Sequence, residues 1–398
     1  MDIISTLHKM NWTELYIERK NSLPSWKANN KIYHSKMLAL SENTDISFNF
    51  MDEAFQKFNN SIIVYNTIYA KRLHQLRKKY SFLRLMYGGG ADSKLILDTA
   101  KKENIFIDEI VTIATWHTNK ADKEELNRAK EHTDEYIKLF PKCVAYTLQL
   151  TLEDWKKYHA DTEMFLSHDG YTEYNDRPKS HSFLYLHSKF SPGMWAPYKK
   201  GLNHCDIVGN MAPSVLIYKD KPYWYVIDEF IGHHLSPFVE YFYTTPDMPE
   251  VQLYQARRYY QIMLQKNIVN TDNISAELLF ELKKATGRDI NQSYKKDFIN
   301  ATHNKNTKDL LTINDKELWK LVFDNAKFLQ NNAKKMNLQI DCPAITTTGI
   351  FSKLISLYDN EHITMTQDIF TETFINKKEN LKFREFEQYE KVWKRYIN

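Results

Sequence analysis

Three consecutive glycines, Gly88-Gly89-Gly90, constrain the fold of this chain more than any other feature of its sequence. The chain has 398 residues and only ten glycines, so three in a row are a marked concentration. They follow an apolar run, Phe82–Tyr87, and precede a segment with an apolar helical face, Lys94–Lys102. Glycine is favoured where the backbone must adopt a positive φ or approach another group closely. The pattern therefore predicts a strand, a glycine turn and a helix.

Two polar residues, Asp92 and Ser93, stand at the expected start of this helix. The amide groups of a glycine turn and the N-terminus of a helix together form a site for an anion such as phosphate. A carboxylate beside phosphate requires a divalent cation, so Asp92 is a candidate ligand of Mg²⁺, while Ser93 can donate its hydroxyl group. The alternative is a tight turn in which Asp92 caps the helix and no ligand binds.

The strand-and-helix pattern continues on both sides of the turn. The periodicity predicts helices at 52–79 and 121–139, strands at 110–115, 144–150 and 206–208, and a hairpin of strands 215–218 and 223–227. Strands that alternate with helices favour a parallel sheet with helices on both faces. The chain thus divides into an N-terminal extension (1–50), an α/β domain (51–250) and a mainly helical C-terminal region (251–398), whose clearest helix is Asp315–Asn337. An irregular stretch at about 160–200 is the candidate substrate loop.

Composition excludes several classes of protein. The formal net charge is +4, with 54 basic and 50 acidic residues interspersed, so no general affinity for nucleic acid follows from net charge. We found neither a signal peptide nor an apolar run long enough to span a membrane, and we expect a cytoplasmic protein. The three cysteines are far apart and form no zinc-binding pairs, so we expect buried thiols.

The segment Gly88–Ser93 resembles the pyrophosphate loop, Ser-Gly-Gly-x-Asp-Ser, of the N-type ATP pyrophosphatases. Only Gly88, which stands in place of serine, departs from the motif. The resemblance implies an α/β parallel-sheet sandwich of the adenine nucleotide α-hydrolase (Rossmann-like) type, with ATP and Mg²⁺ as cofactors. It also implies that Gly88, Gly89, Gly90, Asp92 and Ser93 bind pyrophosphate, and that Asp92 is both a catalytic residue and the metal ligand.

Within this family the layout most resembles the synthetase domain of asparagine synthetase-like enzymes. By position, the resemblance implies that Ile113, Ala114 and Thr115 contact the adenine and ribose. Gly209 matches one glycine of a Ser-Gly-Glu-Gly-x-Asp-Glu pattern, although no Asp-Glu pair follows it. Glu240 replaces the aspartate of a Pro-Phe-Leu-Asp segment. Lys284 and Lys296 stand where the family has catalytic basic residues, although single lysines also occur on solvated helix faces.

These features leave three functions open. The first is an AMP-forming ligase that activates a carboxylate or carbonyl oxygen of a small molecule for attack by ammonia or an amine. Position 2 is Asp2 and not the cysteine of a glutaminase, so ammonia would be free or come from a partner protein. The second is modification of a nucleobase or nucleic acid, for which Arg257-Arg258 and neighbouring lysine pairs would supply a basic face. The third is a nucleotide-binding protein that has lost turnover.

Overall fold

The computed structural model describes most of the α/β part of the chain and several segments outside it. The described residues are 26–33, 46–48, 67–115, 120–151, 153, 197, 200–209, 214–227, 238–267, 276–286 and 351–364. Several predictions lie outside them, namely the helix at 52–66, nearly all of the loop at 160–200, the helix Asp315–Asn337, and Lys296.

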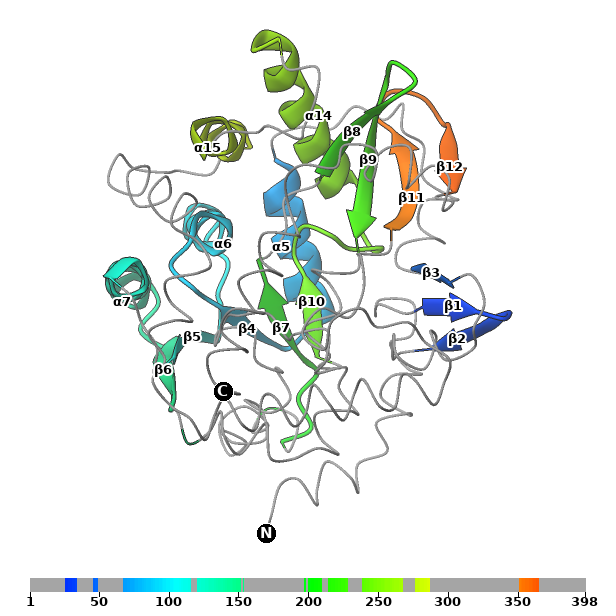
Figure 1. The fold of residues 1–398 in the computed structure, drawn as a ribbon. Coiled ribbons are helices and arrows are strands. Elements are labelled where there is room, and N and C mark those ends of the chain that lie inside the picture. Colours follow the sequence, from blue (N-terminus) through cyan, green and yellow to red (C-terminus); the bar gives the residue numbers. More distant parts are fainter. Residues whose placement is uncertain are drawn as a thin grey trace, which may run out of the picture.

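A five-stranded parallel sheet forms the centre of the fold (Figure 1). Its strands, in chain order, are β4 (Phe82–Met86), β5 (Glu109–Thr115), β6 (Val144–Leu150), β7 (His204–Val208) and β10 (Val239–Tyr241). They lie side by side in the order β10-β7-β4-β5-β6, and every neighbouring pair is parallel. The chain therefore has an α/β fold, as predicted, and the strand order is compatible with a Rossmann-like arrangement.

Three helices pack on one face of this sheet. They are α5 (Ile68–Lys79), α6 (Ala91–Lys102) and α7 (Lys120–Leu139). Their apolar side chains share one buried cluster with Leu83, Leu85, Ile110 and Ile207, which alternate along the strands and so point to the same face. Full burial of each of these side chains contributes about 1.5–3 kcal/mol. On the opposite face Arg84 and Asp206 are completely buried.

The helix after the glycine turn begins earlier than predicted. Helix α6 starts at Ala91, with Gly90 in an extended conformation at its N-cap position. The prediction that Asp92 and Ser93 cap the helix is therefore wrong, and both lie inside its first turn. Alanine is a strong helix former, and an acidic side chain in the first turn is favoured by the helix dipole, so the helix extends back to the glycines.

A second, antiparallel sheet lies beside the first. The predicted hairpin is confirmed as β8 (Ser214–Tyr218) and β9 (Lys221–Ile227), which pair across a turn at Lys219 and Asp220, both with positive φ. Two later strands, β11 (Phe351–Ser356) and β12 (His362–Thr364), complete the sheet by pairing β11 with β9 (Figure 1). This sheet joins segments on both sides of the boundary predicted at residue 250, and the described C-terminal region contains strands as well as helices.

The remaining described elements are one small sheet and two helices. The sheet is antiparallel, in the order β2-β1-β3, with strands β1 (Trp26–Ala28), β2 (Lys31–Tyr33) and β3 (Ile46–Phe48). The helices are α14 (Glu250–Gln265) and α15 (Ala276–Ala285), which pack against each other. Within the described segments no helix combines the length and apolar character that crossing a bilayer requires.

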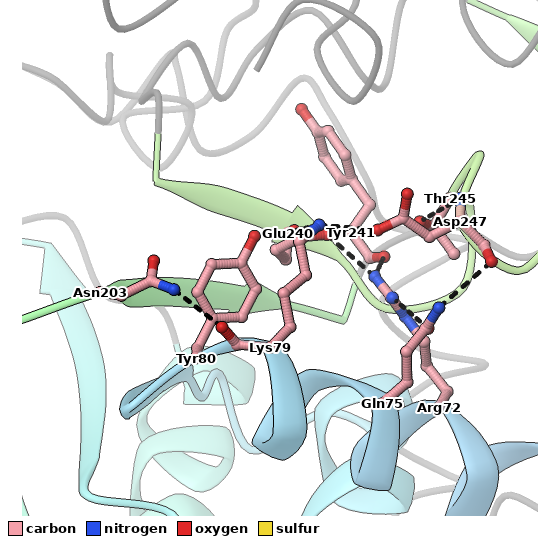
Figure 2. Close-up of polar contacts among 9 residues, drawn as sticks. All are labelled: Arg72, Gln75, Lys79, Tyr80, Asn203, Glu240, Tyr241, Thr245 and Asp247. Atoms are coloured by element: carbon pink, nitrogen blue, oxygen red, sulfur yellow. Dashed lines mark hydrogen bonds and ion pairs between the residues drawn. The ribbon is translucent and has the colours of Figure 1, made fainter. Parts of the chain in front are cut away.

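A buried ion-pair cluster fixes strand β10 to helix α5 (Figure 2). Arg72 donates to Oε2 of Glu240 and to the carbonyl oxygen of Tyr241, at 3.0 and 3.1 Å. Lys79 donates to the other carboxylate oxygen at 3.0 Å, and Tyr80 donates to that same oxygen. Burial by itself raises the pKa of Glu240, but the charges of Arg72 and Lys79 outweigh it and lower this pKa to about 2. The carboxylate is therefore charged, and a second carboxylate, that of Asp247 at 2.8 Å from Nζ of Lys79, balances the remaining positive charge.

Candidate phosphate site at the carboxyl ends of strands β4 and β7

The glycine turn lies where the order of strands in the sheet reverses direction. From β4 the chain proceeds through β5 and β6 on one side and then returns to β7 and β10 on the other. The carboxyl ends of β4 and β7 are level, because Met86 pairs with Val208. In open α/β sheets, ligands bind outside the carboxyl ends of the strands at such a reversal point. The sequence motif and the topology thus indicate the same place.

Gly89 is the one residue of the turn whose conformation and surroundings both require glycine. Its φ is +78°, in the left-handed region that side chains disfavour. A Cβ atom there would also lie far inside van der Waals contact with the backbone oxygen of Glu125 on α7. Gly88 differs, because a Cβ atom added to it would have no neighbour within 4 Å. The turn is therefore packed against α7 at Gly89 and open at Gly88.

Gly209 brings the end of β7 against the first turn of α6. A Cβ atom at this position would lie 3.2 Å from Cα of Ser93 and 2.7 Å from Cδ1 of Ile96. Only glycine allows this close approach without a shift of the helix. The structure thus brings Gly209 and the pyrophosphate-loop residues together, although they are more than a hundred positions apart in the sequence.

The first turn of α6 presents its backbone amides at this edge of the sheet. The first amide groups of a helix have no intrahelical acceptor, and the helix dipole places partial positive charge there. Ser93 is buried and its hydroxyl group donates to the carbonyl oxygen of Gly90 at 3.3 Å. The hydroxyl of Tyr243 donates to the carbonyl oxygen of Asp92 at 2.6 Å. This end of the helix can accept an anion, and Asp92 lies within its first turn.

The end of β5 extends beyond the end of β4. Met86 is the last β4 residue and pairs with Val111, whereas β5 continues through Thr115. Ile113, Ala114 and Thr115, the predicted adenine and ribose contacts, therefore lie in the part of the strand that passes the glycine turn. Ala114 is buried and Ile113 is partly exposed. These three residues share the edge of the sheet with the turn, as their assigned role requires.

The structure places three of the predicted basic residues, Lys284, Arg257 and Arg258, on helices α14 and α15. Lys284 is exposed on α15. Arg257, part of the predicted basic face, donates to the carbonyl oxygen of Leu357 at 2.8 Å, and its guanidinium group lies over the ring of Tyr358. Arg258 is exposed and bonds to Gln261 on its own helix. Arg257 therefore connects α14 to the end of β11, which is a structural role.

Several residues near the site were missed by sequence reasoning. The hydroxyl group of Tyr87 lies 2.6 Å from Nδ1 of His132 on α7. Arg84 forms ion pairs with Glu109 and Asp206, its direct partners on the two neighbouring strands. A charged residue in the middle of an apolar strand, as in Phe82–Met86, indicates a buried ion pair. This pattern could have predicted that Arg84 is buried and paired. Nothing local in the sequence connects Tyr87 with His132.

A magnesium ion would need ligands from the nucleotide at this site. Among the described residues no three histidine, cysteine, aspartate or glutamate side chains are grouped so that they could hold a metal ion. Mg²⁺ commonly binds one or two protein carboxylates together with phosphate oxygens and water. A single carboxylate, Asp92, beside the amide groups of a helix N-terminus fits this pattern. The donor set suits a metal–phosphate complex better than a free metal ion.

Comparison with known proteins adds no family to this description. No family model matches the chain, and no curated protein matches its sequence. The class supported by the structure is therefore an α/β protein with a five-stranded parallel sheet and a candidate anion site at its reversal point.

Proposed function

We propose that the chain binds MgATP with its phosphates at Gly88–Ser93 and cleaves it to AMP and pyrophosphate. The observation that carries the proposal is the position of the glycine turn. It lies between the carboxyl ends of β4 and β7, against the N-terminus of α6, with Gly209 packed on Ser93. The strand order also supports the finer assignment to the adenine nucleotide α-hydrolase type of sheet, since that assignment requires the first strand to stand in the centre.

The chemistry proposed is activation of a small-molecule acid or carbonyl group. A substrate oxygen attacks the α-phosphorus, the bond to the pyrophosphate oxygen breaks, and an acyl- or imidoyl-adenylate forms. Ammonia or an amine then attacks the activated carbon and AMP leaves. The contribution of this chain is positioning and charge stabilisation, because the amides of the turn and the helix N-terminus face negative charge. Mg²⁺ would be held by Asp92 and would neutralise phosphate oxygens.

Two buried thiols support a reducing compartment such as the cytoplasm for this activity. Cys143 and Cys205 are both buried and unbonded to another cysteine. Burial raises the pKa of Cys143 to about 12, so its thiol is inert at neutral pH.

Pyrophosphate release in the presence of MgATP and a panel of carboxylic acids and amines tests the proposal. We expect release that depends on one substrate and is abolished in Asp92→Ala and Asp92→Asn. Glu103→Gln is the matched control, because Glu103 is an acidic residue at the opposite end of the same helix, at its C-cap position. Equal release by the Asp92 variants and the wild type would contradict the proposal.

A second candidate, nucleotide binding without turnover, is favoured by two specific observations. Gly88 lacks the hydroxyl group of the resembling motif, and no Asp-Glu pair follows Gly209 in the sequence. MgATP binding by calorimetry with no AMP formed across the whole panel would select this candidate. Release of AMP with any one substrate would exclude it.

A further inference from the structure

The glycine turn rests on the middle of helix α7 through two separate contacts. Gly89 lies against the backbone of Glu125 and against Ala129, which leave no space for a side chain. One helical turn further along, His132 is hydrogen-bonded to the hydroxyl group of Tyr87, the residue that immediately precedes the glycines. Residues 125, 129 and 132 lie on one face of α7, because helical neighbours recur every three or four positions. The start and the middle of the turn are thus both supported by α7.

The surroundings of Tyr87 and His132 keep both hydrogen-bonded groups uncharged. Burial lowers the pKa of His132, and the positive charge of Lys94 lowers it further. A neutral imidazole has one protonated nitrogen and one acceptor. Burial also raises the pKa of Tyr87, so its hydroxyl group keeps its proton. We assign the phenol as the donor to Nδ1, with the imidazole proton on Nε2.

Charged side chains of both signs surround His132. On α6 and α7, the charged residues that shift the pKa of the imidazole are Lys94, Asp98, Glu131 and Glu135. The charged residues that shift the pKa of the Tyr87 phenol are Asp98, Glu125, Arg128 and Glu135. The carboxylates favour a protonated imidazole, but burial and Lys94 outweigh them. The neutral form therefore prevails in the folded protein at neutral pH.

We propose that Tyr87 and His132 are positioning residues that hold the glycine turn in its phosphate-binding conformation by fixing it to α7. This inference rests on the proposed function, since it assigns the pair to the ATP site. Tyr87 also donates its backbone N–H to Val111 of β5 at 2.8 Å, so the residue is fixed to the sheet and to α7 at once. A turn fixed at its start and its middle loses less conformational freedom when phosphate binds than a free one does.

Calorimetric titration of the full chain with MgATP tests this role. Loss of a buried hydrogen-bond partner lowers the equilibrium constant of the state that depends on this bond by about tenfold. We therefore expect about tenfold weaker binding by Tyr87→Phe and by His132→Ala. The double variant should be no weaker than either single one, because both changes break the same contact. His132→Asn, which keeps an acceptor near Nδ1, should recover most of the affinity. His74→Ala, on the exposed side of α5, should bind as the wild type does.

The pH dependence supplies a second readout, because it compares the shapes of the affinity profiles of wild type and variant and not their absolute affinities. A protonated imidazole cannot accept from Tyr87, so wild-type affinity should fall as the pH falls below 6.5, the ordinary histidine pKa. The part of this fall that the pair causes should be absent in Tyr87→Phe. Equal affinity of wild type and Tyr87→Phe, additive losses in the double variant, or identical pH profiles would each overturn the inference alone. Absence of any MgATP binding by the wild type would overturn the proposed function together with it.

Discussion

The hydroxyl group of Tyr243 donates a hydrogen bond of 2.6 Å to the backbone oxygen of Asp92. Tyr243 is completely buried and follows strand β10, whereas Asp92 lies in the first turn of α6. The contact connects the edge strand of the sheet to the helix end at the candidate site. Arg72 of α5 donates to Glu240 and to the carbonyl oxygen of Tyr241, two residues before Tyr243, so this part of the chain is held on both sides.

Replacing Tyr243 with phenylalanine isolates this contact. The ring and its packing remain, and only the donor is lost, so we expect the free energy of unfolding to fall by about 1 kcal/mol. We also expect weaker MgATP binding, because the first turn of α6 is less firmly held. Chemical denaturation and calorimetry measure the two effects. Tyr260→Phe, which changes a partly exposed tyrosine on α14, is the matched control.

The neighbouring glycines of the turn should respond very differently to alanine. Gly89→Ala places a side chain in the left-handed region, which costs about 1–2 kcal/mol, and adds a clash with the backbone of α7. Gly88→Ala enters open space, and its unfolding free energy should stay within about 0.5 kcal/mol of the wild type. Denaturant titration of the two variants side by side makes this comparison. Equal stability of both would show that the turn does not rest on α7.

Gly88→Ser is expected to improve the site. The open space at Gly88 accommodates a hydroxyl group, and this change restores the serine of the resembling motif. An added donor to a phosphate oxygen should tighten MgATP binding by about threefold to tenfold. Calorimetry compares Gly88→Ser with Gly88→Ala, which fills the same space without a donor. Weaker binding by the serine variant alone would argue against phosphate at this position.

Stability at acidic pH should report the buried carboxylate of Glu240. Its folded pKa, about 2, lies below the ordinary value of 4.5, so its contribution is present above pH 4.5 and is lost as the pH falls towards 2. The shift corresponds to about 3 kcal/mol at neutral pH. We expect the unfolding free energy of Glu240→Gln to be lower by at least this much, since Arg72 stays buried without its carboxylate. We also expect the stability of this variant to fall less than that of the wild type between pH 5 and 2.

The control for this experiment is the exposed ion pair between Lys221 and Glu361. Solvent-exposed pairs contribute little to stability, so Glu361→Gln should leave both the unfolding free energy and its pH profile essentially unchanged. A comparable loss of unfolding free energy in both variants would mean that the burial of Glu240 does not determine how much it stabilises the protein.

Local sequence patterns predicted the helices and strands around the site, whereas contacts between residues far apart in the sequence were not predicted. The apolar run before Gly88 and the helical periodicity after it are readable within twenty residues, and the strand, turn and helix follow from them. The boundary of α6 was wrong because Asp92 favours both a cap and a first-turn position. The hairpin turn at Asn29 and Asn30, which both have positive φ, was not predicted.

The sequence contains no local pattern that indicates contacts between residues brought together only by folding. Tyr87 and His132 are separated by 45 positions, and Tyr243 and Asp92 by 151. The strand Phe351–Ser356 pairs with β9, which precedes it by more than a hundred residues, although that region of the sequence was expected to be mainly helical. Pairing partners of this kind depend on the whole topology and cannot be read from spacing.

The pairing of β9 with β11 also has a consequence for how the protein forms. During synthesis, the hairpin β8–β9 leaves the ribosome before β11, the strand that pairs with β9 and follows it by more than a hundred residues. Until β11 is made, this edge of β9 has no partner from β11. Long-range pairings of this kind slow folding, because the chain must close a large loop before the contact stabilises it. An unpaired edge strand meanwhile can bind another chain. Chains shortened before residue 351 should therefore aggregate more readily than the full-length protein does.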